Sequence, residues 1–181
     1  MARPGKQRGA LLQFRSRTDT PDFIAEGSAG WQGILDAFAS VAAGRTPNPD
    51  SMERWLALRD AYAEDFDVSP TIGLVAGSGS DAELVFNRWY RAPSEDVEAA
   101  VNAAGRTLGL GGDAEMEMTN DGEETRLKVR RPVTASRDQT AALLAAWHMA
   151  LDSVHDQLEG SMPHPNSHRL AALERFYRSM V

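Results

Sequence analysis

All four histidines lie after residue 147, and two of them share a predicted helix with an aspartate. His148, Asp152 and His155 are spaced by four and three residues, which places them along one side of a helix. Two imidazoles with a carboxylate between them can ligate a transition metal, and His164 or His168 could complete such a site. No second helix carries the Glu-x-x-His pattern of a di-metal bundle. The spacing therefore favours a partly exposed side of a helix, and a metal-dependent enzyme that uses these histidines is kept as an alternative.

Other groups that could carry catalysis are scarce. The chain has no cysteine, which excludes disulfides, thiol catalysis and zinc–thiolate sites. The glycine-rich stretch 77–81 lacks the Gly-Lys-Ser/Thr ending of a phosphate loop and leads into a strand pattern, so it is predicted to be a plain hairpin turn. No Ser–His–Asp set can be identified. We therefore predict no catalytic residue, no bound metal and no cofactor.

The histidines belong to the longest helical pattern of the chain. Its apolar stripe repeats every three or four residues and consists of Leu144, Trp147, Leu151, Val154 and Leu158. Ser136 and Gln139 form a capping box at its start, and Gly160 is expected to end it. Because His148 and His155 flank the stripe, we expect them at the rim of a packing or partner surface. Their titration near neutral pH would then make association sensitive to pH.

A hairpin is predicted at Asp121-Gly122, a dipeptide typical of a type I′ turn. A two-residue turn there pairs Asn120 with Glu123. One face of the hairpin then carries the pairs Met118–Thr125, Met116–Leu127 and Ala114–Val129. The other face pairs acids with bases, as Glu117–Arg126, Glu115–Lys128 and Asp113–Arg130. The acidic run is thus predicted to be the solvent face of a hairpin and not a metal site.

The remaining patterns complete an α+β fold. They predict helices over 28–43, 49–66, 93–108 and 168–180, and strands over 71–76 and 83–91. The first helix has an apolar face of Trp31, Ile34, Leu35, Phe38 and Ala42. We predict two layers, with an antiparallel sheet covered on one face by the helices of 94–108 and 136–159. The chain divides into a basic flexible arm, an N-terminal helical extension, an α+β core domain and a C-terminal helical tail, over residues 1–18, 19–47, 48–160 and 161–181.

Charge is distributed unevenly along the chain, whose net charge is −7. Residues 1–18 carry five of the 19 basic side chains and none of the 26 acidic ones. The acidic remainder argues against nucleic acid as a partner, except through the arm, where Arg3, Lys6 and Arg8 could reach an acidic neighbour. No stretch approaches the roughly 18 apolar residues that cross a bilayer, so no membrane partner is expected. We expect a cytoplasmic protein.

Two adjacent aromatic residues end the second strand. Successive side chains of a strand point to opposite faces, so Trp89 and Tyr90 cannot both enter the core. One of them is therefore available as an anchor for a partner or lies under another element.

The order from residue 49 is helix, strand, strand, helix, strand, strand, helix. Three segments carry it: LVFNRWYRAPSEDVEAAVNAAGRTLG, AEMEMTNDGEETRLKVRRPV and SRDQTAALLAAWHMALDSVHDQLEG. Over residues 50–160 this pattern resembles the type III secretion chaperone-like fold, and in particular the YbjN family of small bacterial proteins. The resemblance implies a non-enzymatic, acidic and often dimeric protein that binds peptides or partner proteins along its sheet and helices.

Three functions follow from these observations. The leading hypothesis is a protein- or peptide-binding module with a chaperone-like fold that acts as a homo-oligomer or assembly subunit. The second is a structural or adaptor component of a phage or secretion particle, with the basic arm on a neighbouring subunit. The third is the metal-dependent enzyme.

Overall fold

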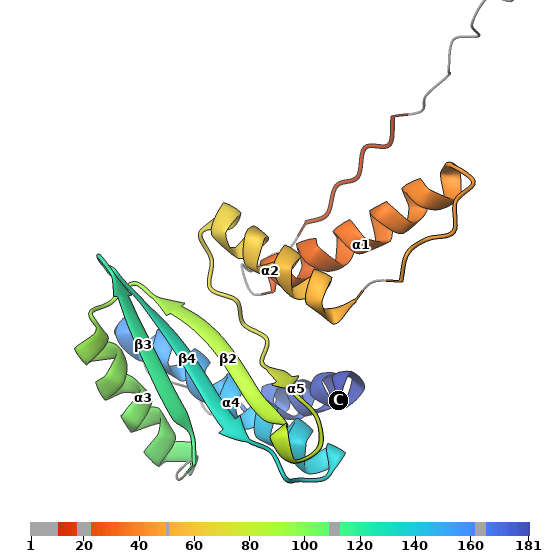
Figure 1. Cartoon of the computed structure of the whole chain (residues 1–181). Coiled ribbons are helices and arrows are strands. Elements are labelled where there is room, and N and C mark those ends of the chain that lie inside the picture. Colours follow the sequence, from red (N-terminus) through yellow and green to blue (C-terminus); the bar gives the residue numbers. More distant parts are fainter. Residues whose placement is uncertain (1–10, 18–22, 50, 109–112, 162–165) are drawn as a thin grey trace, which may run out of the picture.

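A computed structural model of the chain describes residues 11–17, 23–49, 51–108, 113–161 and 166–181. Four antiparallel strands form one sheet in the order β1-β2-β4-β3, with bounds Leu74–Ala76, Glu83–Tyr90, Glu124–Pro132 and Glu115–Asp121. Helices α3 (Ser94–Leu108) and α4 (Arg137–Leu158) cover one face of this sheet (Figure 1). The predicted α+β class with helices on one face is confirmed. None of the described helices is long and apolar enough to cross a lipid bilayer.

Alternation along the two central strands builds the core. In β2 the side chains of Leu84, Phe86 and Tyr90 are buried between the sheet and α4, and in β4 those of Leu127 and Val129 join them. The predicted stripe of α4 packs on this face, and full burial of each large apolar side chain is worth about 1.5–3 kcal/mol. The opposite face of β3 and β4 carries the acidic and basic side chains, as the pattern predicted.

The hairpin between β3 and β4 has its predicted faces in a different register. Met118 lies opposite Leu127, and Glu117 lies opposite Lys128, so every pair is displaced by two residues from the expected one. The two turn residues are Gly122 and Glu123, and Gly122 has a φ of 67°. Glycine in the first central position with positive φ is the requirement of a type II′ turn, which replaces the predicted type I′ turn. An even displacement leaves each side chain on its predicted face.

Two predicted element starts are wrong. Helix α2 (Met52–Phe66) begins after Ser51, whose side chain accepts a hydrogen bond from the Arg54 N–H, and not at Pro49. Helix α1 (Ile24–Ala42) begins four residues before the predicted Ser28, after Phe23 in a left-handed conformation. The capping box of α4 is as predicted, with Ser136 and Gln139 in both hydrogen bonds.

The segment before β1 is held by side chains from both ends of the chain. The backbone N–H groups of Thr71 and Ile72 donate to Oε1 of the buried Glu26, over 2.7 and 3.1 Å. The next N–H, of Gly73, donates to the hydroxyl of Tyr177 over 3.0 Å. These donors are therefore satisfied outside the sheet, which explains why β1 begins at Leu74 and not at the predicted Thr71.

Helix α5 (Ser167–Met180) packs on α4 and adds Leu173 and Tyr177 to the core. The α1–α2 pair is joined to the sheet by the segment that leads into β1 (Figure 1), and Phe23 and Trp55 pack against the core. An ion pair between Glu64 of α2 and Arg126 of β4, 3.0 Å apart, ties α2 to the sheet.

Gly73 is required by the packing of Phe86. A Cβ at residue 73 would lie 2.1 Å from the nearest atom of the buried Phe86 ring. We expect Gly73→Ala to lower the free energy of unfolding by about 1–3 kcal/mol, because the ring must move within a packed core. Urea denaturation measures this loss. Gly105→Ala is the matched control: its Cβ would have open space within α3, so it should raise stability by about 0.5–1 kcal/mol. Equal effects of the two changes would contradict this account.

Candidate functional site

A cavity of about 460 Å³ lies where β2 ends against the second half of α4. The segment that follows α2 and the start of α5 complete its wall, so four separate parts of the sequence meet there. Helix α4 and its C-cap contribute the largest share of the lining, with Leu151, Asp152, His155, Asp156, Leu158 and Glu159. Cavities of this size lie within the range that holds small ligands or a few side chains of a peptide.

The adjacent aromatic residues of β2 both line this cavity, from opposite faces of the strand. Tyr90 is buried, and its hydroxyl donates to the Leu151 carbonyl over 3.1 Å. Burial raises the pKa of Tyr90 above its ordinary value, so the hydroxyl stays protonated. Trp89 is only partly buried, and the Arg126 guanidinium lies 4.6 Å from the centre of its ring. Trp89 is therefore the aromatic residue available for contact.

An ion-pair cluster around the buried Arg88 contributes to the lining of the cavity. Arg88 is 5 % exposed, and its Nη2 donates to Oδ1 of Asp152 over 3.0 Å. Arg169 of α5 donates to the other carboxylate oxygen over 2.5 Å. Asp152 thus joins β2, α4 and α5. The Nε of Arg88 has no hydrogen-bond partner among the described residues. A buried charge depends on its counter-ion, which makes this carboxylate a structural requirement.

His148 lies next to this cluster and is in the interior. It is 1 % exposed, and Nδ1 lies 2.7 Å from the hydroxyl of Tyr177. That hydroxyl already accepts from the Gly73 N–H, so its proton is directed to Nδ1, and Nε2 carries the imidazole proton. Burial, and then the positive charges of Arg88 and Arg169, lower the pKa of His148 to about 2. The expectation that His148 sits at the rim of a partner surface and titrates near neutral pH is therefore wrong.

His155 does not share the environment of His148. Its side chain is 60 % exposed, and Nε2 lies 3.2 Å from a carboxylate oxygen of Glu159. In the described part of the chain, no three histidine or acidic side chains are arranged to hold a metal ion. The alternative metal site of His148, Asp152 and His155 is not formed, because His148 and Asp152 already bind Tyr177 and two arginines. His168 is exposed at the start of α5, and His164 lies outside the described residues.

The basic residues predicted as partner contacts in the arm, Arg3, Lys6 and Arg8, lie outside the described residues. Arg88, Arg169 and Tyr177 were not predicted as site residues. Strand alternation contained one usable signal, because Arg88 has the same parity as the buried Phe86 and Tyr90. An arginine in an inward position requires an acid from the covering helix. Comparison with protein-family models, curated proteins and solved structures finds no match for this chain.

The ion-pair cluster gives a stability prediction. Asp152→Asn leaves the buried Arg88 without a counter-ion and should lower the free energy of unfolding by about 3 kcal/mol. This value is the lower end of the range for a broken buried ion pair, because the Asp152 side chain is 20 % exposed. Asp156→Asn, one turn further along α4, is the matched control and should change stability by less than about 0.5 kcal/mol. Equal losses in urea denaturation of the two variants would contradict the assigned role.

Burial of neutral His148 also gives a pH dependence. The unfolded chain protonates this imidazole near pH 6.5, whereas the folded chain does so only near pH 2. The unfolded state therefore binds more protons between these values, and stability falls as the pH drops below 6.5. His148→Gln cannot titrate but keeps an acceptor for the Tyr177 hydroxyl. Between pH 7.5 and 5.0, the free energy of unfolding of the natural chain should fall by about 2 kcal/mol more than that of this variant.

Urea denaturation at the two pH values measures that difference. Tyr177→Phe is the control, because it keeps the buried imidazole and should keep the pH dependence while losing the hydroxyl contact. A difference between the natural chain and His148→Gln that stays constant with pH would contradict the assignment.

Proposed function

We propose that the chain is a non-enzymatic protein-binding module that holds a short, basic segment of a partner protein in the cavity beside Trp89. The observation that carries this proposal is the composition of the cavity wall. The lining combines the partly buried Trp89 with the acidic side chains of Asp156 and Glu159 and with the ion pair between buried Arg88 and Asp152.

The charge of the wall selects the ligand. Asp156 of α4 and Glu159, the C-cap of that helix, line the cavity together with the partly buried apolar side chain of Leu158. Lysine and arginine combine an aliphatic stem with a positive end, so such a side chain matches this alternation of apolar and acidic groups. An indole face also attracts a cation, as it already does with Arg126 in this structure. A basic peptide is therefore a better ligand than an acidic or purely apolar one.

The chemistry around the cavity supports binding over catalysis. Asp152 is engaged by two arginines, and Asp67 is ion-paired with Arg91. His148 has a pKa far below neutral, so it is a poor proton acceptor at physiological pH. A rigid lining with committed charges suits recognition, because little needs to reorganise when a ligand enters.

The order of elements from α2 to α4 supports a chaperone-like relationship. It is helix, strand, strand, helix, strand, strand, helix, as in the YbjN-like and type III secretion chaperone-like proteins that the sequence resembles. We propose accordingly that the chain works in the cytoplasm, or in a particle assembled there, and that its partners are proteins and not nucleic acids or membranes.

Fluorescence anisotropy with labelled peptides tests the function. The probe is Gly-Ala-Leu-X-Leu-Ala-Gly, with lysine, arginine, glutamine or glutamate at X. We expect the lysine and arginine peptides to bind at least five times more tightly than the glutamate peptide, with the preference reduced by added salt. Absence of binding by any peptide, or equal affinity for lysine and glutamate, would remove the proposal.

Matched variants locate the binding. Asp156→Asn combined with Glu159→Gln should weaken binding of the lysine peptide five- to tenfold, because two carboxylates of the wall are lost. Trp89→Ala should weaken all the peptides alike. Glu98→Gln combined with Glu117→Gln removes the same charge from α3 and β3, away from the cavity, and should leave affinity unchanged. An equal loss in this control would assign the effect to net charge and not to the cavity.

A further inference from the structure

Helix α1 directs its apolar side chains to solvent. Trp31 is 42 % exposed, and Ile34, Phe38 and Val41 are 57–61 % exposed. These four residues, which we call the α1 stripe, are spaced by three, four and three residues. Their spacing is that of the a and d positions of a coiled coil, which lie along one line of a helix. The predicted apolar face of this helix is therefore largely uncovered.

The packing between α1 and α2 uses a different side of α1. Gln32 accepts a hydrogen bond from the Tyr62 hydroxyl over 3.0 Å and donates to Asp36 over 2.8 Å. Asp36 also forms an ion pair with Arg54 of α2. Polar side chains of α1 thus point to α2 while the α1 stripe points away from it. Within a single copy of the described chain, nothing on α2 covers the stripe.

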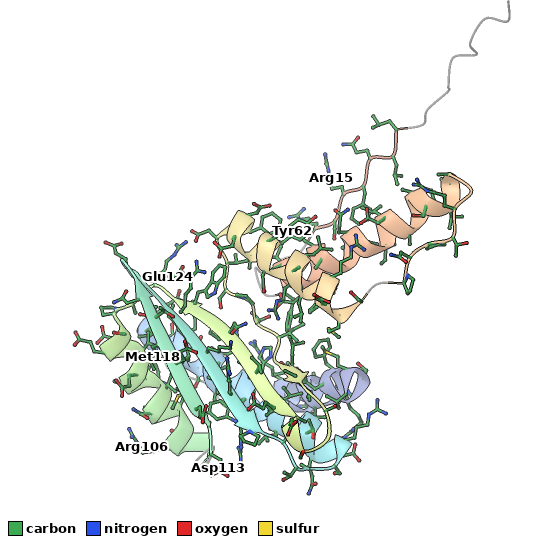
Figure 2. All side chains as sticks on the ribbon, viewed as in Figure 1. Arg15, Tyr62, Arg106, Asp113, Met118 and Glu124 are labelled. Carbon is green, nitrogen blue, oxygen red and sulfur yellow. The ribbon has the colours of Figure 1, made fainter. Side chains whose placement is uncertain are left out.

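An extended segment lies beside the α1 stripe. Figure 1 shows residues 11–17 leading towards α1, and the ring of Phe14 lies 4.5 Å from that of Trp31. Leu11 is 96 % exposed and Leu12 is 59 % exposed. Arg15 projects beside the same helix (Figure 2). The uncovered apolar surface therefore continues from α1 onto this segment.

We propose that the α1 stripe is the seam of a homodimer, in which α1 of a second copy packs against it and Leu11, Leu12 and Phe14 flank the contact. This inference does not rest on the peptide cavity, because the two surfaces are on different elements. It also lies outside residues 50–160, whose pattern resembles the chaperone-like family. A two-fold axis would place the same stripe on both sides of the contact, so the α1 stripe of each copy would cover the exposed stripe of the other.

Charge favours a second copy over other occupants. Helix α1 carries only two charged side chains, Glu26 and Asp36, and both are engaged with other parts of the same chain. Two neutral stripes meet without repulsion, whereas a foreign partner would find no charge on the stripe to recognise. A helix that lies on a membrane surface carries lysine and arginine on its polar side, and α1 has neither.

The area also fits a dimer. A fully exposed large apolar side chain presents roughly 200 Å², so the half-exposed α1 stripe leaves on the order of 400 Å² open. Leu11, Leu12 and Phe14 bring the surface to roughly 800 Å², which is what each partner contributes to a stable protein–protein interface. The α1 stripe alone is too small, which gives the flanking segment a defined role in the contact.

Sedimentation equilibrium of the full chain tests the proposal. We expect a dimer at about 50 µM for the natural sequence, and at least a tenfold rise in the dissociation constant for Ile34→Glu combined with Phe38→Glu. Met52→Glu is the control, an exposed apolar residue of α2 replaced by an acid in the first turn, where acids are favourable. A monomeric natural chain at this concentration, or equal weakening by the control, would overturn the proposal.

A cysteine cross-link provides a second readout that does not require a loss of function. Because the chain has no cysteine, Ile34→Cys introduces a single thiol within the α1 stripe. A short bis-maleimide should join two copies of this variant at least five times faster than two copies of Ala57→Cys, whose residue is exposed on α2. Equal rates would overturn the assignment of the seam. Lipid binding is a separate outcome. If the chain is monomeric in buffer and sediments with vesicles of phosphatidylglycerol and phosphatidylcholine, the α1 stripe binds lipid, and the dimer proposal is overturned.

Discussion

Burial of the Arg88 guanidinium under α4 is the constraint on which the rest of the domain depends. The alternation of β2 brings this charge to the covered face of the sheet, where water cannot stabilise it. Asp152 must therefore lie above it, which fixes how far α4 can slide or rotate along the sheet. Arg169 meets the same carboxylate, which positions the start of α5 on α4. A single carboxylate thus determines how two helices are arranged on one strand.

The polar groups around the Arg88–Asp152 pair fall into two sets, one that completes the interior and one that lines the cavity. His148 and Tyr177 complete the interior by satisfying each other and the Gly73 N–H. The cavity borders this cluster, and its remaining lining includes Trp89 and the carboxylates of Asp156 and Glu159. Two histidines about two turns apart on one helix therefore differ in role: His148 is structural, and His155 is exposed.

The sequence predicted the faces of the elements better than their contacts. Strand alternation and the stripe of α4 identified the core, because burial follows directly from periodicity. The register of the β3–β4 hairpin was displaced by two residues, since both registers keep the same faces and both place Gly122 in the turn with a positive φ. They differ in Asp121, which is paired with Glu124 in β4 and does not adopt the positive φ that a type I′ turn requires. The site was less predictable. Arginine is usually exposed, so its residue type argues against the interior position that Arg88 occupies, and the burial of His148 depends on α5, which is remote in the sequence.

Residues 71–73 show how late the edge of the sheet is completed. Their N–H groups are held by Glu26 from one side and by Tyr177 from the other, across separations of up to 104 residues. Contacts between such distant residues form slowly, because a long loop must close before they contribute. On a ribosome, the anchor at Gly73 cannot form until residue 177 has been made and has emerged. During synthesis this edge of the sheet is therefore incomplete. The growing chain exposes backbone N–H groups that are hydrogen-bonded in the folded protein.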